Sequence, residues 1–168
     1  MAHKKVFVVP FRRKRQGKTD YKKRLALLKS GSLRLVIRKS NKHMQAQLVK
    51  YGAKGDLVLE TVTSKHLKDY GWDMNTGNMS AAYLVGLLIG KKSEGKEAII
   101  DLGLQTPISG SKLFAVLKGA VDGGLKIKYS EDVLPSEERI TLKDQKNADK
   151  IKKSFEKTKE KILSMVKK

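Results

Sequence analysis

The sequence predicts an α/β domain in which helices cover a mixed sheet, and three observations point to this class. Short β-branched runs follow one another closely between residues 33 and 64, joined by turn-like links, which is typical of an antiparallel meander. A long apolar helical segment, a short apolar strand and an amphipathic helix come next, in that order. A strand that returns after a crossover helix lies parallel to its neighbour, so the sheet should be mixed.

The meander strands are expected over residues 33–40, 43–51 and 56–64. The first alternates β-branched residues with bases, and the second alternates less regularly. The links between them are polar or contain glycine, as tight turns require. After the third strand, residues 64–72 favour a helical turn that Gly71 ends.

The central helix is expected over residues 75–90, with Thr76 or Asn78 as its cap. Its run from residue 81 to 89 is apolar on nearly all sides, which is typical of a fully buried helix. A short apolar strand is then expected over residues 96–104. This strand completes the sheet.

Two amphipathic helices follow the sheet residues. Residues 111–124 carry an apolar stripe at helical spacing, and Gly123 and Gly124 end the helix. Residues 147–168 place four apolar residues at near-helical spacing among many lysines. This last helix should be docked on the domain or bound to a partner.

A chain of 168 residues is long enough for one domain with a real core, but short for two. We therefore expect a basic N-terminal arm with a short helix (1–32), an α/β core (33–128) and a C-terminal extension with the Lys-rich helix (129–168). The short helix should run over residues 19–29, with Thr19 as its N-cap and Asp20 in its first turn.

Charge is distributed very unevenly along the chain. The first fifty residues contain sixteen Lys/Arg and one acid, Asp20, whereas residues 51–100 contain six bases and six acids. The formal net charge is +20. Segregation of this kind is typical of a surface that binds a polyanion, and nucleic acid is the obvious one. The alternative for the cluster at residues 12–18 is a solvated tail or a lookalike of a nuclear-localisation signal.

Several features could contact RNA, and each has a structural alternative. Phe7, Phe11 and Tyr21 could stack on bases, or could anchor the arm to the domain. The turn at 38–43 could grip a phosphate or 2′-hydroxyl, or be an ordinary polar hairpin turn. The helix start at 110–112 could bind an anion, or simply be capped by its serine. The candidate RNA-binding residues are Lys4, Lys5, Phe11, Arg12, Arg13, Lys14, Arg15, Lys18, Tyr21, Lys22, Lys23, Arg24, Arg34, Arg38, Lys39, Ser40, Asn41, Lys42, His43, Ser111 and Lys112.

Catalysis, metal sites and membrane spans are not expected. The chain has no Cys, so disulfides, thiolate zinc sites and Cys nucleophiles are excluded. The three His residues lack acidic partners nearby, and Asp101 and Asp122 are too few for a nuclease metal site. The longest apolar run is far below the ~20 residues of a transmembrane helix. We expect an intracellular protein with no cofactor, no membrane partner and no small-molecule substrate.

The motifs together resemble one ribosomal family. PFRRKRQGKTDYKKRLALLKSG, LRLVIRKSNKH, YGW with TGNMSAAYLVGLL, and AIIDLGL with GSKLFAVLKGAVDGGL occur in order over about residues 4–140. They resemble universal ribosomal protein eighteen of the large subunit, whose eukaryotic members are called large-subunit protein five. The archaeal-type form is the most similar.

This resemblance implies a ribonuclease-H-like three-layer α/β/α sandwich without nuclease activity. It also implies a protein that binds 5S ribosomal RNA and helps to fix it to 23S ribosomal RNA in the central protuberance, beside neighbouring large-subunit proteins, in cytoplasmic ribosomes. Residues 4–18 and 19–29 would make the main RNA contacts, with 38–43 and 110–112 as secondary positions. Lys128 and Tyr129 stand where the family often has Pro-His, and no role is carried over to residues 147–168. The alternatives from charge alone are an RNA-processing enzyme or a general polycationic nucleic-acid binder.

Overall fold

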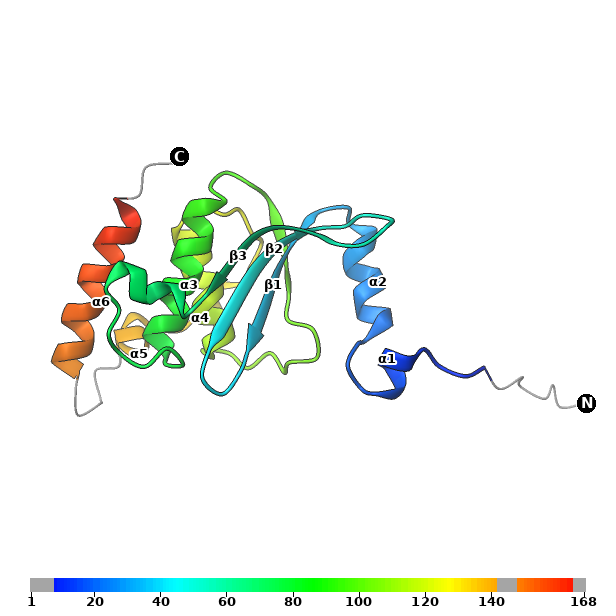
Figure 1. Ribbon diagram of the computed structural model, residues 1–168, viewed down its shortest axis with the longest axis horizontal. Helices are drawn as coiled ribbons and strands as arrows, with labels where there is room; N and C mark the ends of the chain where they lie inside the picture. Colours follow the sequence, from blue (N-terminus) through cyan, green and yellow to red (C-terminus); the bar gives the residue numbers. More distant parts are fainter. Residues whose placement is uncertain (1–7, 142–147, 165–168) are drawn as a thin grey trace, which may run out of the picture.

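The protein forms one four-stranded sheet, as seen in a computed structural model that describes residues 8–141 and 148–164. The strands are β1 (Leu33–Lys39), β2 (Met44–Lys50), β3 (Leu57–Thr63) and β4 (Ala98–Asp101), in the spatial order β3-β2-β1-β4. β2 is antiparallel to both β1 and β3, whereas β1 and β4 are parallel (Figure 1). The predicted meander and the mixed sheet are confirmed.

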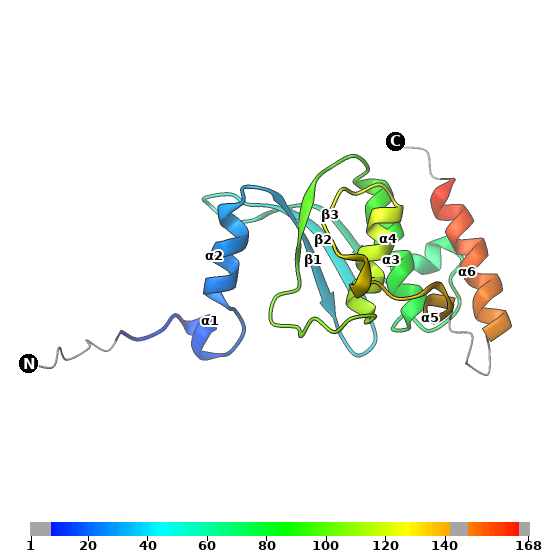
Figure 2. The same cartoon turned by 180° about the vertical axis from the view of Figure 1, so that it is seen from behind.

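Helices lie on both sides of this sheet, as the α/β class requires. α3 (Met79–Lys92) and α4 (Lys112–Asp122) pack on one side, and α1 (Arg12–Arg15) and α2 (Tyr21–Lys29) lie beyond the other (Figures 1 and 2). The remaining elements are the 3-10 helices η1 (His66–Tyr70) and η2 (Glu131–Val133) and the helices α5 (Glu137–Thr141) and α6 (Ala148–Leu163). No helix within the described ranges is both long enough and apolar enough to span a bilayer.

The two faces of the sheet differ because side chains alternate along each strand. Leu35, Ile37, Ala46 and Leu48 are fully buried against α3 and α4. On the other face, Val36 of β1 and Gln45 and Gln47 of β2 are only half-buried. One face therefore forms the core, and the other is partly open toward the side on which α2 lies.

The contact between α3 and α4 is unusually close because glycines lie at the crossing. A Cβ placed on Gly86 would overlap the backbone carbonyl of Val116, and one on Gly119 would overlap that of Tyr83. α3 is buried along almost its whole length, from Met79 to Gly90. The prediction of a fully buried central helix is confirmed.

The helix caps correct one sequence expectation and confirm another. The Asn78 side chain accepts a hydrogen bond from the Ala81 N–H at 2.7 Å, so Asn78 rather than Thr76 caps α3. Asp20, and not Thr19, is the N-cap of α2, and it accepts from the Lys23 N–H at 3.0 Å. Thr19 lies one residue before this cap, and its hydroxyl accepts from Arg13 Nε at 2.8 Å.

The C-terminal helix is docked on the domain. Ile151, Phe155 and Ile162 of α6 are buried in the same core as α3 and α4. The Phe155 ring lies 5.6 Å from the ring of Tyr83, whose hydroxyl donates to Asp122 at 2.7 Å. Burial, followed by this bond to a carboxylate, raises the pKa of Tyr83. Of the two alternatives for residues 147–168, docking holds for the described part of the helix.

Candidate nucleic-acid interface

α1 presents four consecutive bases, and two contacts tie this turn to α2. Phe11 precedes α1, and its ring lies 5.2 Å from the ring of Tyr21 at the start of α2. The Arg13–Thr19 hydrogen bond closes the loop between the two helices. The pair Phe11–Tyr21 therefore anchors the arm locally. Phe11 is still 71% exposed, so stacking on a base stays a prediction for its free side.

Bases from three separate elements converge on one groove of about 320 Å³, which we call the arm groove. Its basic lining residues are Arg13, Lys18, Lys23, Arg24 and Arg38. Asp20 and Asp101 are the acids among them. The arm, α2 and the end of β1 thus share a single basic surface, although they are separate in sequence.

A chain of alternating charges runs beneath this surface, from α2 to the end of β1. Arg24 Nη2 lies 2.8 Å from Asp56 Oδ2, and the same oxygen lies 2.7 Å from Arg34 Nη2. Arg34 Nη1 in turn lies 3.0 Å from Asp101 Oδ2, and Arg38 Nη2 lies 3.2 Å from Asp101 Oδ1. We call these three arginines and two aspartates the charge network.

The charge network is partly buried, and burial sets its chemistry. Arg34 is only 2% exposed, so its charge requires the two carboxylates that flank it. Partial burial tends to raise the pKa of Asp56, but the hydrogen bonds and positive charges of Arg24 and Arg34 outweigh it and hold that pKa below its usual value. Asp56 therefore stays ionised at neutral pH, and the ion pairs with Asp56 and Asp101 hold Arg24 and Arg38 at the rim.

Asp101 also fixes the loop that follows β4. It accepts from the Gly103 N–H at 2.9 Å, and Arg38 Nη1 donates to the Asp101 carbonyl at 2.7 Å. Gly103 has a φ of +61°, and a Cβ there would lie 2.9 Å from the Arg38 guanidinium carbon. β4 ends at Asp101, earlier than the expected residue 104. Asp101 is thus a strand-end residue whose side chain accepts a hydrogen bond from the backbone of the next loop.

The turn between β1 and β2 borders a second groove of about 310 Å³, the turn groove. Ser40 shapes the turn, since its hydroxyl donates to the His43 carbonyl and accepts from the His43 N–H, both at 3.0 Å. Arg38 lines both this groove and the arm groove. The other residues that line the turn groove are Lys39, Ser40, His43, Met44, Gln45, Thr63 and Lys65.

The turn at residues 38–43 and the helix start at residues 110–112 are the two secondary positions implied by the family resemblance, and they lie side by side. Thr76 donates to the Lys42 carbonyl at 2.9 Å, and Lys112 Nζ donates to the carbonyl of the next residue, Gly77, at 2.6 Å. A Cβ on Gly77 would lie only 3.2 Å from the Asn41 carbonyl oxygen. The β1–β2 turn and the start of α4 therefore meet across residues 76–77.

The candidate residues fall into four groups by exposure. Tyr21, Arg24, Arg38, His43 and Ser111 are half-buried, Arg34 is buried, and Lys4 and Lys5 lie outside the described residues. Because Arg34 lies inside the charge network, we leave it out of the RNA-facing surface. The exposed candidates are Phe11, Arg12, Arg13, Lys14, Arg15, Lys18, Lys22, Lys23, Lys39, Ser40, Asn41, Lys42 and Lys112.

Sequence reasoning missed the acids that organise this surface. Asp56 lies in the loop before β3, and Asp101 lies at the end of β4, so neither is near its arginine partners in sequence. Lys65 was also missed, although it lines the turn groove. No local motif identifies these residues. The pairing of β1 with β4 brings Asp101 to Arg34 and Arg38, whereas Asp56 reaches Arg34 from the loop before β3.

Metal binding finds no support in the described ranges, where no three His, Cys, Asp or Glu side chains cluster as ligands. His43 Nδ1 lies 3.3 Å from Ser64 Oγ and 3.1 Å from Thr76 Oγ1. His66 Nδ1 accepts from the Thr63 N–H at 3.3 Å. Both rings therefore have local hydrogen-bonding roles.

Comparison with known proteins identifies the family of this basic domain. A family model described as "Ribosomal large subunit proteins 60S L5, and 50S L18" matches residues 5–96 and 91–130. The large ribosomal subunit protein uL18 of Haloarcula marismortui is 51% identical over 136 residues, which cover 79% of this chain and 73% of that protein. The chain therefore belongs to this family of large-subunit ribosomal proteins, and it is a structural, non-enzymatic constituent of the ribosome in the cytoplasm.

Proposed function

We propose that the protein binds 5S ribosomal RNA and helps to attach it to 23S ribosomal RNA in the central protuberance of the large subunit. The observation that carries this proposal is the arm groove, where Arg13, Lys18, Lys23 and Arg38 from three elements face one surface. The proposed contacts are α1, α2 and the β1–β2 turn, with Lys112 at the edge of this surface.

Binding on this surface is electrostatic and follows the shape of the RNA. Each Lys or Arg brought against a phosphate releases condensed counterions, so affinity falls steeply as salt rises. Arg38 donates to Asp101 and to backbone carbonyls, which fixes its guanidinium before RNA arrives. Arg24 and Arg38, which are half-buried and held by ion pairs, set the position of the RNA on this surface. The exposed bases of α1 supply most of the phosphate contacts.

The test measures the binding of 5S RNA to the full chain as a function of salt. The variant R12Q/R13Q/K14Q/R15Q should bind more weakly and lose about one unit of log–log salt slope for each phosphate contact removed. The matched control K150Q/K152Q/K153Q/K157Q removes the same charge from α6, at the far end of the molecule (Figure 1). It should retain most of the affinity.

Equal losses of affinity in the α1 and α6 variants would mean that only net charge matters, which would favour a general polycationic binder.

Two further measurements complete this test. Deletion of residues 1–18 should weaken binding at least as much as the α1 variant. Competition by bulk duplex DNA should be weak compared with competition by unlabelled 5S RNA.

A further inference from the structure

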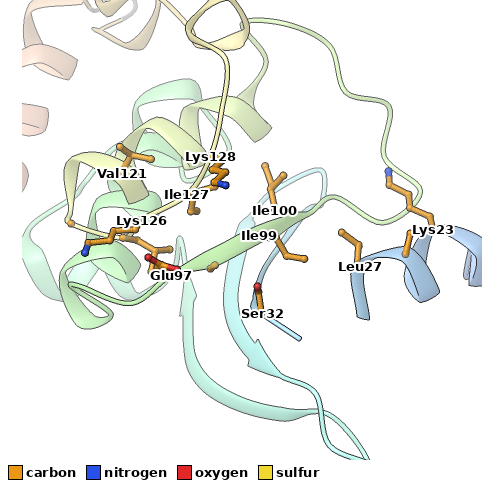
Figure 3. A pocket seen from close by; sticks show the side chains of 14 residues that line it. Lys23, Leu27, Ser32, Glu97, Ile99, Ile100, Val121, Lys126, Ile127 and Lys128 are labelled. Atoms are coloured by element: carbon orange, nitrogen blue, oxygen red, sulfur yellow. The ribbon is translucent and has the colours of Figure 1, made fainter. Parts of the chain in front are cut away.

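A third, larger groove lies between α2 and β4, and its lining is mainly aliphatic. Its volume is about 950 Å³, within the range of binding sites for ligands and side chains. Leu27 of α2 faces Ile99 of β4, and Ile100 lies on the side of Val121 and Ile127 (Figure 3). We call this the edge groove, because β4 is the outer strand of the sheet.

The outer edge of β4 is paired only at its beginning. The Ala98 N–H donates to the Lys126 carbonyl at 3.0 Å, and the Lys126 N–H donates to the Lys96 carbonyl at 2.9 Å. Beyond this bridge the structure gives no hydrogen bond between β4 and residues 127–129. Because backbone groups alternate along a strand, the N–H and C=O of Ile100 point to the same edge as those of Ala98. They are available to one more strand.

The side chains at this edge match the two-residue repeat of such a strand. Ile100, Val121 and Ile127 each pack against the core, and they line the groove on the core side of the sheet. Ile99 is on the opposite face, in register with Arg34, and lies toward Leu27. An extended chain added to β4 would place alternate side chains into these two apolar halves. A helix or a folded RNA has no such repeat.

The rim of the edge groove is basic, and this indicates the charge of the occupant. Lys23, Lys126 and Lys128 are exposed around it, with Glu97 as the acid among its lining residues. No aromatic side chain lines the groove, so it offers no stacking surface to a base. Aliphatic walls would also desolvate phosphates without hydrogen-bonding them. Apolar side chains flanked by acids fit this chemistry best.

We propose that the edge groove binds an extended segment of a neighbouring large-subunit protein, which adds to β4 as an outer strand. Apolar residues at alternate positions of that segment fill the groove, and acidic residues beside them pair with the lysine rim. The inference uses the family membership of the chain and does not depend on the binding of 5S RNA.

The test places a photo-cross-linking benzoylphenylalanine at Lys128, on the groove rim, in full-length protein assembled into large subunits. The same group at Tyr129 is the matched control, because Tyr129 is the next residue and does not line the groove. The group at Lys128 should cross-link to an extended peptide of another ribosomal protein, with acids beside alternating apolar residues. The group at Tyr129 should not give that peptide.

A second pair of variants asks whether the groove itself is the binding site. A26W fills the groove from α2 and should abolish the cross-link from position 128. L25W adds the same ring at a position 55% exposed outside the groove and should preserve it. A cross-link from position 128 to ribosomal RNA, to a second copy of this chain or to nothing would overturn the proposal, as would an unchanged cross-link in A26W.

Binding of 5S RNA is measured in parallel for the same variants, so that the two proposals are separated. An intact protein cross-link together with absent 5S binding would contradict only the proposed RNA function. Normal 5S binding without a protein cross-link would contradict only the edge-groove proposal.

Discussion

The N-terminal end and the α3–α4 layer of this protein are held in place by different kinds of contact. Neither α1 nor α2 contains a buried residue, whereas α3 is buried from Met79 to Gly90. α2 is connected to the domain by the Arg24–Asp56 ion pair and by a 3.2 Å hydrogen bond from Lys23 to the Gly103 carbonyl. α3 and α4 are joined by backbone contacts at glycines.

This difference separates stability from binding. The α3–α4 layer depends on apolar burial and close packing, which salt affects little. The N-terminal end depends on charges near solvent, which salt and a polyanion both affect. Arg34 is the exception, because it belongs to the basic end by charge and to the core by burial. The first prediction uses this exception.

The largest effect is expected when the charge network loses Asp101. D101N keeps the shape of the side chain but leaves Arg34 with only Asp56 as a counter-charge. Removal of one partner from a buried ion pair is costly, so urea unfolding should show a loss of about 3 kcal/mol. D73N, at an exposed position, should change stability by less than about 0.5 kcal/mol. A loss below about 1 kcal/mol in D101N would mean that the buried charge of Arg34 does not depend on Asp101.

A smaller loss is expected from G86A, which tests the packed layer. The added Cβ would overlap the Val116 carbonyl, so α3 and α4 must separate. Overpacking should cost about 3 kcal/mol, of which the better helix propensity of alanine returns about 1 kcal/mol. The net loss should be about 2 kcal/mol in thermal or urea unfolding, while K92A in the same helix should be nearly neutral. A stabilised G86A would show that the close crossing is not needed.

The smallest effect concerns pH and Asp56. Its pKa is lowered in the folded protein, so its stabilising contribution is complete above the ordinary carboxyl pKa and disappears as pH falls through the lower folded value. The free energy of unfolding of the wild type should therefore exceed that of D56N near neutral pH. The two should converge in acid, once the pH lies below the lowered pKa of folded Asp56. A difference that is independent of pH would mean that Asp56 acts through its shape and not its charge.

The sequence predicted the elements well where a single pattern decides the structure. The apolar run of α3, the stripe of α4 and the alternation in β1 all reflect burial, which the periodicity of the residues records directly. The cap of α2 was wrong by one residue, because Thr and Asp are both good caps and their order alone does not decide which one accepts from the first turn. α1, η2 and α5 were not predicted, since each is too short to show a period.

The candidate site was predictable in composition and not in organisation. The bases of the arm and of the β1–β2 turn are plain in the sequence, but their convergence at the arm groove depends on Arg38 and Lys23 meeting in space. Arg34 shows why charge alone misleads, since it has the same local pattern as Arg38 and yet is buried. The division into residues 1–32, 33–128 and 129–168 stays a prediction.

The interior position of β1 has a consequence for how the chain acquires its structure during synthesis. β2 follows β1 after one short turn, but β4, on its other side, is translated only after β2, β3 and α3. Until then the emerging hairpins have one unprotected border, and Arg34 lacks its deeper counter-ion, Asp101. Closure of the sheet therefore awaits a contact that is distant along the chain, which should make it a late step in folding. A guanidinium on that border with Asp56 as its counter-charge and without Asp101 disfavours premature burial and mispairing until the second carboxylate emerges.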